Sequence, residues 1–113
     1  MGNNFIELAN VPSLDDFVTQ LNGSAGILFK HSSTCGVSSR AYGEMSQLNC
    51  AVGLVVVQHA RQVSNEIENR WRVTHETPQV LIVQDGKVVW SASHFEVKAR
   101  DVEAALQKVN GEP

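Results

Sequence analysis

An unbroken apolar run in the middle of the chain constrains the fold more than any other feature. Residues 54–57 are Leu-Val-Val-Val, and a β-branched run of this kind is typical of a strand that other elements cover on both faces. After this run, Val63, Ile67 and Trp71 recur at the four-residue spacing of a helix with one apolar face. A covered strand followed by an amphipathic helix predicts an α/β fold, with helices on both faces of a central sheet.

Similar patterns along the rest of the chain predict an alternating order of strands and helices. Besides the central strand, we expect strands at residues 5–8, 25–29, 80–83 and 88–90 and helices at 13–21, 35–49, 63–71 and 102–109. Ser13 is expected to cap the first helix, and residues 22–24 and 110–113 to end the first and last helices. Asp85-Gly86 predicts a two-residue hairpin between the last two strands. The order β-α-β-α-β-α-β-β-α describes a mixed sheet in one domain, residues 1–113.

Composition narrows the range of partners. The 113 residues carry a formal net charge of −3 with no basic stripe, so nucleic acid is not an expected partner. The longest apolar stretch, residues 51–57, is too short to span a bilayer, and residues 1–4 lack the features of a secretory signal. Only two cysteines are present, and neither context suggests a disulfide scaffold. These observations predict a cytoplasmic protein that binds neither membranes nor nucleic acid.

Cys35 stands where the second expected strand gives way to a helix. Backbone N–H groups point outward at such a turn and the helix dipole favours negative charge, so this position favours the nucleophilic thiolate. Ser38 lies three residues on, where a dithiol redox protein carries its second cysteine. The spacing predicts thiol chemistry that cannot be resolved within its own motif. Ser38 either donates a hydrogen bond to the thiolate or faces solvent in the first turn of the helix.

Pro78 stands just before the apolar run at residues 80–83, at the head of the expected strand. This strand should lie close to the strand that leads to Cys35. Proline lacks an N–H group and therefore needs a special reason to stand at the head of an internal strand. A cis Thr77-Pro78 bond is one such reason, because it would present the Thr77 backbone to a ligand whose sulfur meets Cys35. The alternative is a trans proline that merely starts a strand.

The joint pattern resembles the thioredoxin fold, and longer segments resemble the monothiol bacilliredoxin family. These segments are Phe29-Lys30-His31-Ser32 before Thr34-Cys35, residues 63–67, His75-Glu76-Thr77-Pro78-Gln79 and residues 89–94. The resemblance covers nearly the whole chain. It implies a glutaredoxin-like oxidoreductase that takes bacillithiol, or a similar low-molecular-weight thiol, off S-thiolated client proteins. The small thiol would be a co-substrate, with no tightly bound cofactor and no metal.

Within this resemblance, Cys35 corresponds to the reactive cysteine and Thr77-Pro78 to the cis-proline loop. We expect Ser38 to act with Cys35 in catalysis. The residues expected to bind substrate are Thr34, Gly36, Thr77, Pro78, Lys30 and His94.

Two of these candidates have alternative explanations. Lys30 could lend positive charge near the thiolate or meet a carboxylate of the small thiol, but it could also be a solvated lysine at the end of a strand. His94, at the last strand–helix loop, could line the same groove, although the ordinary polarity of loops explains it equally well.

Two residues depart from the family pattern. The family usually has proline directly after the reactive cysteine, whereas this chain has Gly36, which resembles the Cys-Gly-x-Ser motif of iron–sulfur-binding monothiol glutaredoxins. An iron–sulfur carrier, in which Cys35 and small thiols bridge a cluster between two chains, is therefore an alternative function. A thioredoxin-like interaction domain without redox turnover is another alternative function.

The second departure is Lys98, which stands where related sequences tend to place a helix-capping threonine.

Three other residues have structural explanations. A helix from Cys35 to Asn49 would hold Cys50 about 20 Å from Cys35, so Cys50 is not an expected resolving thiol. His31 either helps to stabilise the thiolate or is satisfied by the backbone, and the histidines show no metal-site spacing. Gly43 costs its helix about 1 kcal/mol against alanine, which favours close packing at that position.

Overall fold

The computed structural model describes residues 4–111 and confirms the predicted α/β fold. The elements are β1 (Phe5–Glu7), α1 (Val11–Leu21), β2 (Gly26–His31), α2 (Gly36–Met45), β3 (Val52–Val56), α3 (Arg61–Trp71), β4 (Gln79–Gln84), β5 (Lys87–Ser93), the short 3₁₀ helix η1 (His94–Glu96) and α4 (Ala99–Gly111). The predictions for residues 1–3 and 112–113 lie outside the described residues.

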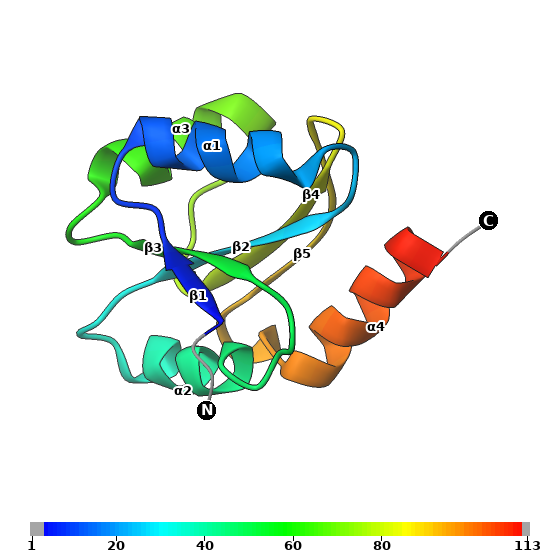
Figure 1. Ribbon diagram of the computed structural model, residues 1–113. Helices are drawn as coiled ribbons and strands as arrows, with labels where there is room; N and C mark the ends of the chain where they lie inside the picture. The colour runs from blue at the N-terminus through cyan, green and yellow to red at the C-terminus, as the bar shows by residue number, and fades with distance from the viewer. Residues whose placement is uncertain (1–3, 112–113) are drawn as a thin grey trace.

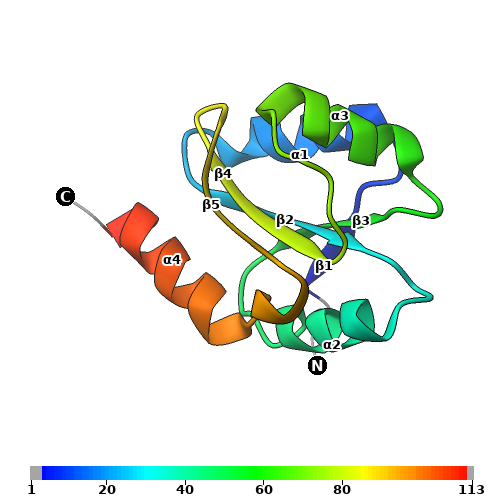
Figure 2. The ribbon, with the colours of Figure 1, turned by 180° about the vertical axis from the view of Figure 1, so that it is seen from behind.

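Five strands form one sheet in the order β1-β3-β2-β4-β5. β1 and β2 run parallel to β3, whereas β4 runs antiparallel to both β2 and β5. Helices α1 and α3 cover one face of this sheet, and α2 and α4 lie on the other (Figure 1, Figure 2). The predicted hairpin is confirmed, since Asp85 and Gly86 both have positive φ angles, 53° and 77°, as a two-residue hairpin of the primed type requires.

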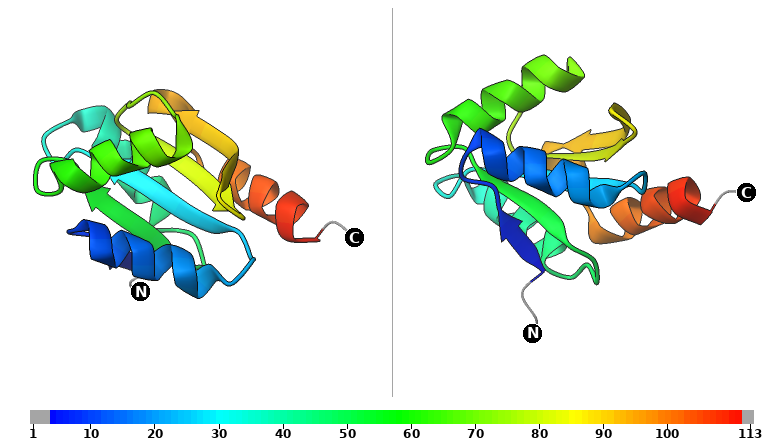
Figure 3. Two further views of the ribbon diagram at one scale, coloured as in Figure 1. Left: turned by 90° about the horizontal axis from the view of Figure 1, so that it is seen from above. Right: turned by 45° about the horizontal axis from the view of Figure 1, so that its top comes forward.

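Successive residues of the inner strands point to opposite faces of the sheet and pack into two separate hydrophobic cores. Phe29 and Leu54 pack with α2 and α4, while Leu28 and Val55 pack with α1 and α3. The views in Figure 3 show the two helical layers on either side of the strands. Leu54 and Val55 of the central run are therefore buried on opposite faces of β3, as the sequence predicts, whereas Val56 is half-buried at the end of the strand and Val57 lies beyond it.

All four helices differ from the prediction in at least one boundary, and two of these differences have a clear physical cause. Asn10, not Ser13, caps α1: the Asn10 side chain accepts a hydrogen bond from Ser13 N at 2.9 Å, and Ser13 Oγ accepts one from Asn10 N at 3.2 Å. This reciprocal pair satisfies two N–H groups at the helix start. α2 ends at Met45 rather than at Asn49, because tight turns such as Gln47 N to Glu44 O, at 3.1 Å, close its last carbonyls.

The start of α4 is capped from another helix. Lys98 precedes α4, and the first helical N–H group, that of Ala99, donates to Glu44 Oε1 of α2 at 2.7 Å. A carboxylate at a helix N-terminus also interacts favourably with the helix dipole. Glu44 therefore does for α4 what a local threonine cap would do.

β2 extends two residues beyond its predicted end and carries Lys30 into the interior. The Lys30 side chain is 0% exposed, and its strand neighbour across the ladder is Gln79. Lys30 Nζ and Gln79 Oε1 both lack a hydrogen-bond partner among residues 4–111. Burial lowers the pKa of Lys30 to about 8, although the charge of Glu68 acts in the opposite direction. The alternative of a solvated strand-end lysine is therefore wrong.

Replacing two glycines by alanine is expected to have opposite effects on stability. Gly43 is exposed within α2 and an added Cβ would contact nothing within 4 Å, so the expectation of close packing there is wrong. Gly43→Ala should raise the free energy of unfolding by about 0.5–1 kcal/mol. At Gly53 the Cβ would lie 2.9 Å from Leu8 Cδ1, so Gly53→Ala should lower it by about 1–3 kcal/mol. Chemical denaturation of both variants checks this pair, and stabilisation by Gly53→Ala would contradict it.

Replacing Lys30 by methionine is expected to change how stability depends on pH. Because the pKa of Lys30 falls from 10.5 to about 8 on folding, the unfolded chain binds more protons between these values. The wild type should therefore gain stability over that window relative to Lys30→Met, by about 3 kcal/mol at 1.36 kcal/mol per pKa unit. Below pH 8 the cost of burying the charge is fully present. Denaturation curves at pH 7, 8.5 and 10 measure the difference, and parallel pH profiles would contradict it.

Candidate active site

The antiparallel pairing of β2 with β4 brings the two predicted functional segments to one end of the sheet. Lys30, near the end of β2, lies opposite Gln79, the first residue of β4. The loop at residues 32–35 follows β2 directly, and Thr77 and Pro78 directly precede β4. Both segments therefore emerge at the same edge. The Thr77–Pro78 peptide bond is cis, as expected.

Cys35 is the N-cap residue of α2, with extended backbone angles of φ −111° and ψ 127°. Its thiol is free and half-buried. Cys35 O accepts a hydrogen bond from Ser39 N at 2.9 Å, which closes the first turn of the helix. The sulfur makes no cap hydrogen bond in this structure, so the first-turn N–H groups are available to a negatively charged sulfur at this position.

Ser38 is held beneath this turn by two hydrogen bonds. Its side chain is fully buried, so the alternative of a solvent-facing serine is wrong. Ser38 Oγ accepts from Ser32 N at 2.9 Å and lies 2.8 Å from His31 Nδ1. A neutral His31 with its proton on Nε2 accepts the Ser38 hydroxyl proton at Nδ1. The hydroxyl of Ser38 therefore ties the end of β2 to the start of α2.

His31 is itself enclosed by aromatic rings. Its ring centroid lies 5.6 Å from that of Phe29 and 4.9 Å from that of Tyr42. Burial lowers the pKa of His31, although its hydrogen bond with Ser38 acts in the opposite direction. His31 is thus a packed side chain whose ring is hydrogen-bonded to Ser38, and its lowered pKa favours the neutral imidazole near neutral pH.

Gln58, which no sequence motif indicates, holds the loop that leads to Cys35 through three hydrogen bonds. Gln58 Nε2 donates to Ser32 Oγ at 2.9 Å and to Thr34 Oγ1 at 3.1 Å, while Gln58 Oε1 accepts from Ser33 N at 3.3 Å. Gln58 lies between β3 and α3, 24 residues from Thr34, so no local pattern could reveal it. Gly36, the first residue of α2, has open space around it, since an added Cβ would meet nothing within 4 Å.

His94 lies beside Pro78. The His94 N–H group donates to Pro78 O at 2.9 Å, and His94 Nε2 is 3.5 Å from Glu76 Oε1. Thr77 is half-buried, and its hydroxyl lies 3.3 Å from His75 Nε2. The structure thus groups His94 with the cis-proline segment, whereas Lys30, whose side chain is enclosed, does not line the surface.

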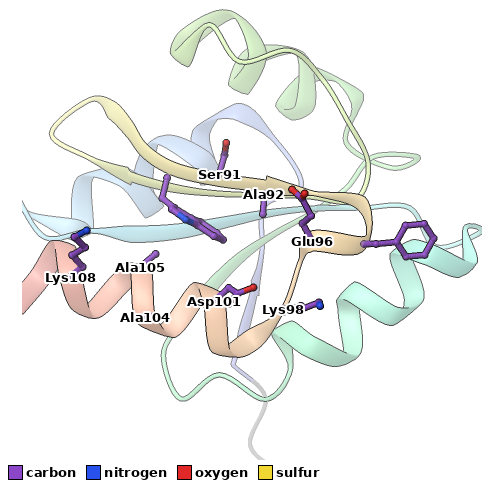
Figure 4. A pocket seen from close by; sticks show the side chains of 10 residues that line it. Ser91, Ala92, Glu96, Lys98, Asp101, Ala104, Ala105 and Lys108 are labelled. Atoms are coloured by element: carbon purple, nitrogen blue, oxygen red, sulfur yellow. The ribbon is translucent and has the colours of Figure 1, made fainter.

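The described residues form several hollows. One of about 400 Å³ is lined by Ser32 and Gln58 of the loop region and by side chains of α3. A second of about 650 Å³ lies between β5 and α4 and is lined by charges of both signs, including Lys98 and Asp101 (Figure 4). Only the first borders the segment that carries Cys35.

The part of the chain that the structure describes has neither a metal-ligand cluster nor a membrane-spanning helix. Residues 4–111 contain no group of three His, Cys, Asp or Glu side chains that could hold a metal ion. No helix within the same residues has the length and apolar character needed to cross a membrane.

Comparison with solved structures places this geometry in a known fold. A protein described as a candidate oxidoreductase with a thioredoxin fold superposes with a TM-score of 0.82 at 24% identity, over 90% of this chain and 93% of the other. Fasciola hepatica thioredoxin gives 0.74 at 14% identity, over 91% and 97%. Trypanosoma brucei brucei thioredoxin gives 0.75 at 11% identity, over 96% and 92%. The chain therefore has the thioredoxin fold, as expected.

The family model for monothiol bacilliredoxin BrxC matches residues 6–102. The match includes Cys35, Ser38 and the Thr77–Pro78 segment, and it supports a thiol redox function at the site described above. The chain belongs to the monothiol bacilliredoxin family.

Proposed function

We propose that this protein is a glutaredoxin-like thiol–disulfide oxidoreductase that removes bacillithiol, or a similar small thiol, from cysteines of client proteins in the cytoplasm. The observation that carries the proposal is the position of Cys35. Cys35, whose thiol is free and half-buried, is the N-cap residue of α2 at the sheet edge where the cis Thr77–Pro78 segment also emerges. A ligand that pairs with the backbone of that segment would bring its sulfur toward Cys35.

In the first step, the Cys35 thiolate attacks the small-thiol sulfur of the mixed disulfide on the client. A new disulfide forms between Cys35 and the small thiol, the disulfide bond between the client and the small thiol breaks, and the client leaves as a thiolate that takes up a proton. No net oxidation occurs, because one disulfide replaces another. The N-terminal end of α2 supports the negative charge on sulfur before the attack.

A second molecule of the small thiol then clears the adduct. Its thiolate attacks the adduct at the small-thiol sulfur, which releases Cys35 and forms the oxidised, disulfide-linked small thiol. Ser38 cannot replace that thiol, because its hydroxyl cannot form a disulfide. The protein therefore needs a small thiol or a partner thiol in every cycle.

Cys50 is poorly placed to resolve the adduct. It lies just before β3, whose first residue Val52 pairs with Ile27, whereas Cys35 follows His31, which pairs with Val56. These two registers are four residues apart along β3, a length of about 13 Å. Cys50 packs against the core, and burial raises the pKa of its thiol. Cys50 is thus at the opposite end of the sheet with a thiol that ionises reluctantly.

We expect oxidised bacillithiol to add a single bacillithiol to the wild-type protein through Cys35. Intact-mass spectrometry should show one adduct on the wild type and on Cys50→Ser, and none on Cys35→Ser. Cys50→Ser is the matched control because it removes the other thiol. An adduct that persists in Cys35→Ser, or a wild-type adduct that maps to Cys50, would refute the assignment.

The open space beside Gly36 keeps iron–sulfur transfer as a second candidate function. Apart from its two chain neighbours and the backbone of α2, no atom comes within 4 Å of a Cβ built there, so other parts of the chain leave room for a bulky group at this position. Anaerobic reconstitution with iron and sulfide in the presence of the small thiol tests this function. A visible charge-transfer absorbance that disappears in Cys35→Ser would support a cluster, and a colourless protein would exclude this second function.

A further inference from the structure

Two buried polar groups stand directly opposite one another where β4 begins. Lys30 of β2 and Gln79 of β4 are partners in the antiparallel ladder, so their side chains point to the same face of the sheet. Lys30 is 0% exposed and Gln79 is 3% exposed. Among residues 4–111, Lys30 Nζ and Gln79 Oε1 have no hydrogen-bond partner. A buried ammonium needs an acceptor and a buried amide oxygen needs a donor, and the ladder places these two side chains next to each other.

The nitrogen of the same Gln79 amide holds the loop that precedes β4. Gln79 Nε2 donates to Thr74 O at 3.0 Å, and Gln79 directly follows Pro78. The hydrogen bond therefore closes residues 74–79 into a ring that contains the cis peptide bond before Pro78. An ammonium only donates and a backbone carbonyl only accepts. Lys30 and Thr74 thus favour the same orientation of the Gln79 amide, with its oxygen toward the ammonium.

Helix α3 also contacts this loop, through His75. His75 Nδ1 lies 3.3 Å from Ser64 Oγ of α3, and His75 Nε2 lies 3.3 Å from the Thr77 hydroxyl. Glu68 of α3 accepts a hydrogen bond from His75 N at 3.4 Å. At 3.0 Å, the hydrogen bond from the buried Gln79 amide is shorter than each of these three contacts. Its loss should therefore loosen the loop more than the loss of any one of them.

The position of Thr77 depends on how firmly this loop is closed. The β2–β4 ladder begins at the pair of Lys30 and Gln79, so Thr77 and Pro78 lie just outside it. Pro78 O accepts a hydrogen bond from His94 N at 2.9 Å, which fixes the proline side of the peptide bond. On the other side, the Gln79 amide closes the loop that leads to Thr77. The place of the Thr77 backbone therefore follows from the Gln79 tether.

We infer that Gln79 is a positioning residue for the client chain and that Lys30 acts through it. Held by the Lys30 ammonium at its oxygen and by Thr74 O at its nitrogen, the Gln79 amide keeps the Thr77 backbone in place for a client segment that pairs with it in β fashion. A client loses these pairing contacts when the tether is removed, whereas a disulfide without a polypeptide chain loses nothing. This inference rests on the proposed function and adds to it how the client side of the substrate is recognised.

The test compares two substrates that carry the same bacillithiol disulfide. In one, bacillithiol is attached to the single cysteine of a short unstructured peptide. In the other, it is attached to an isolated cysteine with an acetylated amino group and an amidated carboxyl group. Both are turned over with bacillithiol in excess. The measured quantity is kcat/KM for the peptide divided by kcat/KM for the isolated cysteine, with KM and kcat determined separately.

The variants separate the tether from the stability of the sheet. Gln79→Glu keeps an acceptor for Lys30, but an ionised carboxylate cannot donate to Thr74 O. Lys30→Met/Gln79→Met replaces both partners by apolar side chains, so no buried ammonium or amide is left unpaired. Gln84→Glu is the matched control, because Gln84 ends the same strand and its Nε2 donates to Gly23 O at 3.2 Å, at the opposite end of β4.

We expect the ratio to fall about tenfold in Gln79→Glu and in the double variant, the size of one or two lost hydrogen bonds. The fall should appear in KM for the peptide, while the isolated cysteine reacts within about twofold of the wild-type rate. A merely structural role would instead slow both substrates alike. The ratio in Gln84→Glu should stay within about twofold of the wild type.

A ratio within about twofold of the wild type in both Gln79→Glu and the double variant would overturn the inference and leave the proposed function intact. An equal fall in Gln84→Glu would also overturn it, because any weakening of β4 would then have the same effect. Should Gln79→Glu fail to fold, the double variant decides alone. A wild type that clears bacillithiol from neither substrate would overturn both the inference and the proposed function.

Discussion

The antiparallel ladder between β2 and β4 is the interaction on which the site depends. It sets Lys30 opposite Gln79 and so places the loop at residues 32–35 at the same edge of the sheet as Thr77 and Pro78. Both strands are enclosed on their two faces. A one-residue slip would turn every buried side chain to the wrong face. The two cores therefore fix the register, and the register fixes the site.

A second constraint operates within the loop itself. The Ser38 hydroxyl accepts a hydrogen bond from Ser32 N and lies within hydrogen-bond distance of His31 Nδ1. Gln58 donates a hydrogen bond to the Ser32 hydroxyl of the same loop. The serine that stands in the place of a second cysteine is thus part of the scaffold around Cys35. This arrangement gives a physical reason for a buried serine at that position, since both hydrogen bonds would be lost or weakened with a sulfur.

Much of the fold was predictable because its signals are local. The apolar run at residues 54–57, the Asp85-Gly86 turn and the amphipathic spacing from Val63 each depend on neighbours in sequence. The Asn10 cap was missed because Ser13 has an equally suitable side chain and belongs to the same capping box. The roles of Gln58 and Glu44 and the burial of Lys30 could not be predicted, because each depends on a contact with a distant segment.

The central claim is that a single thiol performs the whole cycle, and turnover without Cys50 tests it most directly. The experiment gives Cys50→Ala a bacillithiol-modified client with bacillithiol in excess. It measures the release of the free client thiol over multiple turnovers. The account predicts a turnover rate within about twofold of the wild type, because Cys50 lies at the opposite end of the sheet from Cys35. Loss of turnover in Cys50→Ala would contradict it and would make Cys50 a resolving thiol.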